Sequence, residues 1–224
     1  MNKLTKPLTN LFVKSNLTPK KSTPTIVDNQ DHNWIRYQSK LPWLELNMSV
    51  PYNEILGEIK LNSKFLVDHR DEYGEHQGWK SFCIHGKELT ETGSIIDDRP
   101  YHWIPEIVTS MPVTVNYFKS WGLDFYRLRV MALEPGGFVS VHQDVTVSSL
   151  SPINIAITQP EGCKFVVEGW GVVPFKVGTS FMLDIANRHA VINNSNETRY
   201  HIIAHYAELN NKFKKIVEDS YYNN

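Results

Sequence analysis

The chain has 224 residues, of which 41% are hydrophobic and 21% charged, and its formal net charge at pH 7 is −1. This composition is typical of an ordinary globular protein, and without a block of basic residues it argues against nucleic-acid or other polyanion binding. No apolar run is long enough to span a membrane, so the composition also excludes a helical membrane protein.

The N-terminal segment and the two cysteines point to an intracellular protein. Residues 1–30 are rich in Lys, Thr, Asn and Pro and predict a loosely ordered arm, which makes a poor signal peptide. Cys83 and Cys163 are far apart and match no metal-binding spacing, which is typical of reduced thiols. We therefore predict a cytoplasmic location.

Residues 31–123 are predicted to form a helical and mixed elaboration that packs on the core, so that 31–224 form one compact domain. Apolar spacing and alternation predict three elements in it: a helix within 51–67, a strand at 78–86 and a second helix within 105–121. On the second helix, Val113, Tyr117 and Trp121 are expected to share one face.

From residue 124 to residue 224 the sequence changes to short β-rich runs separated by turn signals such as Pro-Gly-Gly at 135–137. Eight strands are predicted: 125–133, 138–142, 153–159, 164–170, 172–177, 180–185, 189–193 and 199–207. A closing helix is expected at 209–219. Short strands at this spacing favour a mainly β fold with flanking helices, either a barrel or a double-sheet jelly roll.

The sequence Val-His-Gln-Asp contains the first candidate metal ligands, His142 and Asp144. Residues two apart on a strand project from the same face, so these two side chains are expected to point together. A second triplet, His69-Arg70-Asp71, warns that the spacing alone is weak evidence. Because that triplet follows a helical run in a polar stretch, we predict a solvated loop there, which includes His76.

His189, at the start of a later strand, is the candidate third ligand. Two histidines and one carboxylate on one face, with the other positions open, form the ligand set preferred by non-haem Fe(II). The sequence therefore predicts an iron site built from three separate positions.

Arg199 lies ten residues after His189, across an Asn-rich turn. Inside a barrel its charge would be costly unless it met an anion, and its guanidinium group is suited to bind a carboxylate through two hydrogen bonds. A surface arginine paired with Glu197 or Glu208 is the alternative. His201 and His205 share a strand face with Arg199, and we expect a core role for them.

The segments 127–144, 161–164, 170–171, 178–184 and 189–199 together resemble the aspartyl/asparaginyl β-hydroxylase family. The family comprises Fe(II)- and 2-oxoglutarate-dependent oxygenases with a double-stranded β-helix (a jelly-roll, cupin-like fold), and it includes bacterial free-proline hydroxylases. The resemblance covers about residues 124–208, and before this region only residues 78–86 resemble the family, weakly. The retained Asp144 and the lack of a signal anchor make the chain look more like the bacterial and phage members.

The resemblance implies roles for individual residues. His142, Asp144 and His189 would hold iron, Arg199 would bind the distal carboxylate of 2-oxoglutarate, and Asn154 would face its other carboxylate. The expected reaction uses O2, releases succinate and CO2, and hydroxylates a C–H bond of an amino acid or a peptidyl side chain.

Two other functions stay open at this point. One is a cupin-like metal-binding or sensing protein without turnover, and the other is a nucleic-acid demethylase of the dioxygenase type, which usually carries more arginines after the last ligand. For the hydroxylase, the candidate substrate-binding residues are Arg127, Arg129, Trp79 and His85. Whether the substrate is a free amino acid, a peptide or a protein is left open by the sequence.

Overall fold

The computed structural model describes residues 41–69, 76–93, 100–144 and 152–223. The predicted N-terminal arm and Asp71 lie outside this part of the chain. The boundary between an N-terminal elaboration and a catalytic core stays a prediction.

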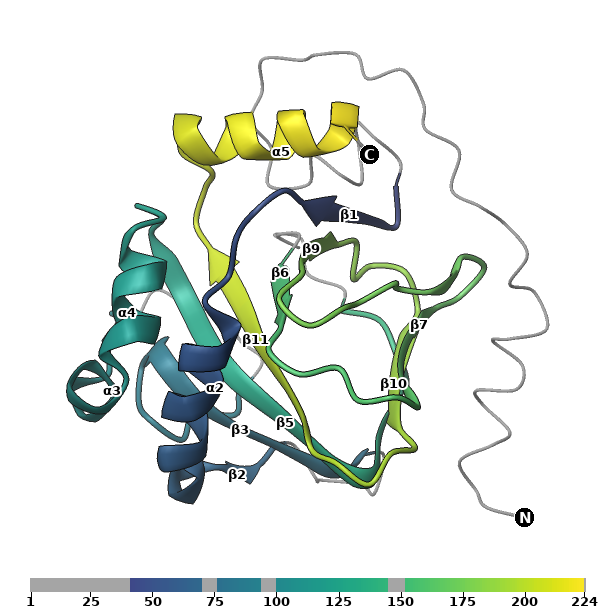
Figure 1. The fold of residues 1–224 in the computed structure, drawn as a ribbon, viewed down its shortest axis with the longest axis horizontal. Coiled ribbons are helices and arrows are strands. Elements are labelled where there is room, and N and C mark those ends of the chain that lie inside the picture. Colours follow the sequence, from purple (N-terminus) through teal and green to yellow (C-terminus); the bar gives the residue numbers. More distant parts are fainter. Residues whose placement is uncertain (1–40, 70–75, 94–99, 145–151, 224) are drawn as a thin grey trace.

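The fold is organised around one long strand, β5 (Phe125–His142), which contains two of the predicted strands and the Pro-Gly-Gly turn between them. Before the turn β5 pairs with β11 (Arg199–Tyr206), and after the turn it pairs with β10 (His189–Asn193). In Figure 1 the chain of β5 bends sharply where these two pairings meet. The turn therefore passes the chain from one sheet to the other.

The remaining core strands continue these two sheets. They are β6 (Ile153–Ala156), β7 (Cys163–Val167), β8 (Gly171–Val172) and β9 (Ser180–Leu183). One sheet runs β9-β6-β11-β5 and the other runs β5-β10-β7-β8, with all pairs antiparallel. This arrangement confirms the predicted double-stranded β-helix, a mainly β fold with flanking helices.

Strands from the N-terminal half extend the barrel on both sides. The elements are β1 (Trp43–Leu46), β2 (Val67–Asp68), β3 (His76–Gly86) and β4 (His102–Trp103). β1 pairs with β9, while β3 pairs with β5 on both sides of the turn. The predicted strand at 78–86 is confirmed and begins two residues earlier.

The helices cover the outer face of the β5-β11-β6-β9 sheet (Figure 1). They are α2 (Tyr52–Leu61), the 3₁₀ helix η2 (Ser63–Phe65), α3 (Pro105–Ser110), α4 (Pro112–Lys119) and α5 (Asn211–Asn223). The predicted second helix is interrupted at Met111, because Pro112 cannot donate the next helical hydrogen bond. α4 buries Thr114, Val115 and Phe118, whereas Val113 is exposed, so the predicted face was wrong.

Two apolar cores lie on opposite faces of this sheet. The larger joins the helices to the outer face and includes Ile55, Phe118 and Phe213. The smaller fills the barrel interior between the two sheets; it contains Leu133, Val139, Ala156, Phe165, Val167, Val173, Phe175, Phe181, Leu183 and Val191. A side chain that points toward this second group points into the barrel, which is where the candidate site lies.

The predicted strand at 172–177 is mostly wrong. β8 ends at Val172; Val173 still donates its backbone N–H to the carbonyl of Phe165 at 2.9 Å, and Val173 and Phe175 belong to the interior core. Among the described residues, no helix is both long and apolar enough to cross a membrane.

Candidate metal and cosubstrate site

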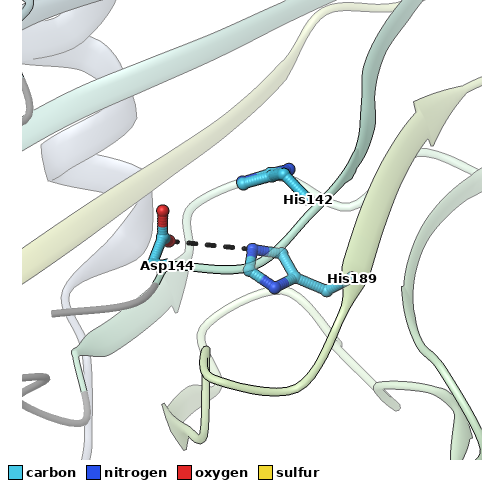
Figure 2. Close-up of side chains that lie close together, drawn as sticks. All are labelled: His142, Asp144 and His189. Atoms are coloured by element: carbon cyan, nitrogen blue, oxygen red, sulfur yellow. Dashed lines mark ion pairs between the residues drawn. The ribbon is translucent and has the colours of Figure 1, made fainter.

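The structure brings His142, Asp144 and His189 together at one end of the barrel (Figure 2). One ligand atom from each residue can be chosen so that the three lie within 4.8 Å of one another. The Nε2 atom of His189 is 3.8 Å from Asp144 Oδ2, and the two imidazole rings are 4.3 Å apart. These residues come from the end of β5, the residues after it and the start of β10.

A β-bulge directs His142 toward this cluster. Val139 pairs with Val191, and His142 pairs with His189. Between these two pairs β5 advances by three residues and β10 by two, so β5 contains one extra residue. In a regular strand, residues three apart point to opposite faces, but the extra residue places His142 on the interior side together with Val139. Strand alternation alone, on which the sequence argument relied, does not produce this arrangement.

Asp144 reaches the cluster by a different route from the one expected. β5 ends at His142, and the backbone N–H of Asp144 donates to the carbonyl of Ile185 at 3.0 Å. This bond ties Asp144 to the turn that precedes His189. The two candidate ligands do point together, but a backbone contact rather than strand geometry holds Asp144 in place.

Both histidines are oriented for metal binding through Nε2. Nδ1 of His142 donates to the carbonyl of Ser140 at 2.7 Å, and Nδ1 of His189 donates to the carbonyl of Asn187 at 2.9 Å. A carbonyl oxygen only accepts, so each ring donates through Nδ1, and the neutral form of that tautomer has its lone pair on Nε2. Ligating histidines generally have such a backbone partner on the second ring nitrogen.

His189 is buried, and its ring stacks on Phe165 with 5.2 Å between centroids. Burial and the neighbouring His142 lower the pKa of His189 to about 4. The imidazole is therefore neutral at neutral pH, which is the state that binds a metal ion. The two imidazoles and one half-exposed carboxylate fit Fe(II) as a facial ligand set.

Arg199 begins β11 deep in the barrel, where its Cζ lies 5.7 Å from the centre of the Phe175 ring. The residue is 6% exposed, and within the described part of the chain no carboxylate forms an ion pair with it. Burial lowers the pKa of Arg199 to about 10, so the group stays charged at neutral pH. An uncompensated buried charge costs several kcal/mol, and an anionic ligand would remove much of that cost. The alternative pairing with Glu197 or Glu208 is not observed.

The sequence model of the aspartyl/asparaginyl beta-hydroxylase family matches residues 52–208. The chain belongs to this family. It is thus a hydroxylase of the Fe(II)- and 2-oxoglutarate-dependent oxygenases, which use O2. The match begins at α2, so it includes the N-terminal helices and β3 as well as the barrel.

Solved structures similar to this hydroxylase include three oxygenases. An oxidoreductase of the 2OG-Fe(II) oxygenase family from Burkholderia pseudomallei is 16% identical, with 79% of this chain and 88% of that chain covered and a TM-score of 0.48. A Pseudomonas putida prolyl-4-hydroxylase is 14% identical, with coverages of 80% and 97% and a TM-score of 0.47. A Trichoplax adhaerens prolyl hydroxylase, solved with a hypoxia inducible factor peptide, is 12% identical, with 98% of both chains covered and a TM-score of 0.47. No curated protein sequence matches the chain.

The hydroxylase places Asn154 on the interior face of β6. Asn154 pairs with Phe181 and lies two residues from Ala156, and both of those neighbours belong to the interior core. The residue is 3% exposed. Asn154 therefore lies on the same interior face as Arg199, while its contact with a cosubstrate stays a prediction.

Arg127 and Arg129 lie on β5, on the same face as Leu133, and both are buried. Each donates to the carbonyl of Gly93, at 2.6 Å from Arg127 and 2.9 Å from Arg129. Arg129 also forms an ion pair with the buried Glu91 at 3.4 Å. Both guanidinium groups thus have protein partners, and substrate binding by them stays a prediction.

The two aromatic substrate candidates lie in different places. Trp79 packs against the interior core and contacts the rings of His69 and His76 at 4.1 and 5.0 Å. His85 instead packs against Trp103 and Phe125 of the larger core, and burial lowers its pKa. Of the two, only Trp79 is connected to the metal cluster through a neighbouring ring.

Two histidines depart from the prediction of a solvated loop. His69 is 4% exposed, and its Nδ1 lies 2.7 Å from the hydroxyl of Ser81, so the prediction was wrong for this residue. His76 is half-buried in β3, with its ring 6.0 Å from that of His142. The backbone N–H of Ser140 donates to Nδ1 of His76 at 3.3 Å. The sequence pattern predicted the strand only from residue 78, so the true start of β3 at His76 was assigned to the loop.

Proposed function

We propose that the enzyme hydroxylates a C–H bond of an amino acid or a peptidyl side chain, with His142, Asp144 and His189 as the iron ligands and Arg199 as the anchor of 2-oxoglutarate. The observation that carries this proposal is the pairing of a two-histidine, one-carboxylate cluster with a buried guanidinium that lacks a carboxylate partner among the described residues. A metal-binding or sensing protein would need the cluster but not the buried arginine.

The protein residues contribute binding and orientation. The backbone carbonyls that accept from Nδ1 of His142 and His189 fix the two rings, so that Nε2 of each ring is the nitrogen left to bind a metal ion. In this proposal Arg199 binds the distal carboxylate of 2-oxoglutarate through charge-assisted hydrogen bonds, and Asn154 faces the other end; the burial of both side chains supports these roles. Iron, when bound, would activate O2, which oxidises 2-oxoglutarate to succinate and CO2 and the substrate C–H bond to C–OH, with one oxygen atom of O2 entering succinate and the other entering the substrate.

The apolar barrel interior also supports this function. Phe175 lies against Arg199, and its ring contacts the rings of Phe165 and Phe181 in the interior core, so the buried charge has apolar surroundings. A charge in such surroundings interacts more strongly with a bound anion than the same charge does in water. The barrel thus favours a small anionic cosubstrate in the interior and leaves the half-exposed side of Asp144 for the substrate.

Substrate identity is the finer part of the proposal. Arg127, Arg129, Trp79 and His85 stay the candidate substrate residues, and an amino acid or peptide stays the expected partner. No nucleic acid is expected, because no basic block marks the sequence. We also keep the cytoplasm as the proposed location.

The test is a succinate-release screen with Fe(II), 2-oxoglutarate and O2 against free amino acids and short peptides. His142→Ala serves as the blank, and His102→Ala, which changes an exposed histidine on β4, serves as the matched control. We expect succinate from the wild type and the control and none from the blank. If wild-type turnover, including uncoupled turnover, did not depend on His142, the proposed function would be wrong.

A further inference from the structure

The guanidinium of Arg199 is held by a closed set of hydrogen bonds. Its Nε donates to Gln159 Oε1 at 3.2 Å, and its Nη2 donates to Nδ1 of His201 at 2.9 Å. His201 Nε2 in turn donates to the same Gln159 oxygen at 3.2 Å. The amide nitrogen of Gln159 is fixed on the carbonyl of Cys163 at 2.9 Å, which sets the amide orientation. Each of the three side chains thus fixes the other two.

All of these partners are electrically neutral. Because Arg199 can only donate, Nδ1 of His201 must be unprotonated, and the proton sits on Nε2. Burial, and then the charge of Arg199, lower the pKa of His201 well below its usual value. His201 therefore orients the arginine without adding a second charge or cancelling the first.

Phe175 closes a further side of the group. Its ring lies 5.7 Å from the Arg199 guanidinium carbon and 4.7 Å from the His201 ring. With Nε and Nη2 engaged and the face covered, Nη1 is left as the nitrogen that donates to no described group. Arg199 has no counter-ion among the described residues, so a ligand carboxylate bound at Nη1 would supply one.

We propose that Gln159, His201 and Phe175 form a neutral clamp that positions Arg199 to bind the distal carboxylate of 2-oxoglutarate. This inference rests on the proposed function of Arg199 and adds positioning residues for it. A carboxylate in the clamp would neutralise Arg199 internally and compete with the cosubstrate. A clamp without its acceptor would let the guanidinium turn away from the bound acid.

A pair of His201 variants tests the hydrogen bond. In His201→Asn the amide oxygen occupies the place of Nδ1 and can still accept from Arg199, whereas His201→Phe keeps a ring but has no acceptor. We expect the dissociation constant of 2-oxoglutarate, measured from the charge-transfer absorbance of the anaerobic Fe(II) complex, to rise about tenfold or more in His201→Phe and less than about threefold in His201→Asn. The kcat at saturating 2-oxoglutarate should change less than KM. His205→Phe, on the same face of β11, is the matched control.

Gln159→Glu tests neutrality with an almost isosteric change. The new carboxylate would pair with Arg199, so the cosubstrate-free protein should unfold at a higher temperature while 2-oxoglutarate binding weakens at least tenfold. Opposite shifts in stability and affinity are not expected from a merely structural residue. Gln77→Glu, the same change at an exposed position on β3, should alter neither quantity.

The outcomes separate this inference from the proposed function. If Arg199→Met loses 2-oxoglutarate binding while His201→Phe and Gln159→Glu bind it like the wild type, the clamp is wrong and the proposed function stands. If the wild type itself binds no 2-oxoglutarate, or Arg199→Met binds it normally, the proposed function is wrong as well. Loss of binding in His201→Phe and Gln159→Glu, with retention in His201→Asn, supports the clamp.

Discussion

Two buried arginine sites lie on the interior side of the same pair of strands and differ in their partners. Arg129, on β5, forms an ion pair with the buried carboxylate of Glu91 and donates to the carbonyl of Gly93. Arg199, on β11, is equally buried but is held by the neutral Gln159 and His201. Arg129 has its own counter-ion, whereas Arg199 has none among the residues that the structure describes.

The difference indicates how a buried charge can be assigned a role. A buried ion pair with its own partner contributes to the folded protein itself, and removing one member leaves the other charge uncompensated. A buried charge held only by neutral groups weakens the ligand-free protein, and this cost is recovered when an anion binds. The contrast therefore predicts that Arg129 contributes to the stability of the fold, alongside its candidate role toward the substrate, and that Arg199 contributes to cosubstrate binding. Both sides of the comparison can be tested.

The largest expected effect comes from Arg199→Met. Losing a buried charge-assisted contact costs about 2–5 kcal/mol, so we expect 2-oxoglutarate to bind about 30- to 5,000-fold more weakly. The free energy of unfolding without cosubstrate should fall by no more than about 1 kcal/mol, because the desolvation cost of the charge disappears with its hydrogen bonds. Titration with 2-oxoglutarate and urea unfolding measure the two quantities. If Arg199→Met bound 2-oxoglutarate as tightly as the wild type, Arg199 would have no role in binding, and the contrast with Arg129 would be wrong.

The opposite result is expected for Arg129→Met. The substitution leaves Glu91 buried without its ion-pair partner, and the free energy of unfolding should fall by about 3 kcal/mol. 2-Oxoglutarate affinity should stay within about twofold of wild type for the folded protein. Glu91→Gln is the companion variant, and it should also destabilise the protein. A large loss of cosubstrate affinity in Arg129→Met would show that the two sites do not have separate roles.

A smaller effect is expected at His76, which accepts from the backbone N–H at the bulge that directs His142. His76→Phe removes the acceptor, and we expect Fe(II) affinity to fall about tenfold, as is typical when a group that supports a metal ligand is lost. His76→Asn keeps an acceptor near the position of Nδ1 and should restore most of the affinity. Metal titration under anaerobic conditions provides the measurement. Equal losses in both variants would mean that the ring itself, and not the hydrogen bond, is what matters.

The smallest effect concerns acid pH. The folded-state pKa of His201 lies below the unfolded value, so between these two values the unfolded chain binds more protons. The stability of the cosubstrate-free protein should therefore decrease as pH falls below about 6.5, with a contribution from His201 of at most about 1.4 kcal/mol per pH unit. His201 faces Arg199, Gln159 and Phe175, and among these only Arg199 is charged. Urea unfolding at pH 7 and pH 5.5 should give a smaller decrease for His201→Asn than for wild type. An identical decrease would contradict the assignment.

Much of the barrel could be predicted from the sequence because its turns are marked by glycine and proline and its strands by apolar alternation. The order of His142, Asp144, His189 and Arg199 along those strands then indicated the site. The bulge before His142 could not be predicted, because an extra residue leaves the local pattern of apolar residues almost unchanged. The metal cluster was thus expected for a reason that is only partly right.

The burial of His69 could not be predicted from its polar sequence neighbours. A histidine within a charged stretch suggests a solvated loop, yet the His69 ring contacts that of Trp79, and its Nδ1 is hydrogen-bonded with Ser81 on β3. The roles of Gln159 and His201 were equally hidden, since only the folded sheet brings residue 159 beside residues 199 and 201. Contacts between separate strands carry information that local patterns lack.

The bend of β5 has a consequence for how the chain finds its fold. At the bend Gly78 has a φ of +63°, and a Cβ on Gly137 would come within 2.8 Å of the carbonyl oxygens of Gln77 and Glu134. A one-residue slip between β3 and β5 would place side chains where the backbones leave no room for a methyl group, and it would turn every side chain of β3 to the wrong face. Gly78 and Gly137 thus help to fix the register between β3 and β5, which lie far apart in the sequence. Pairing across the bend is therefore expected to be all-or-none, and such long-range pairing is expected to be slow to form.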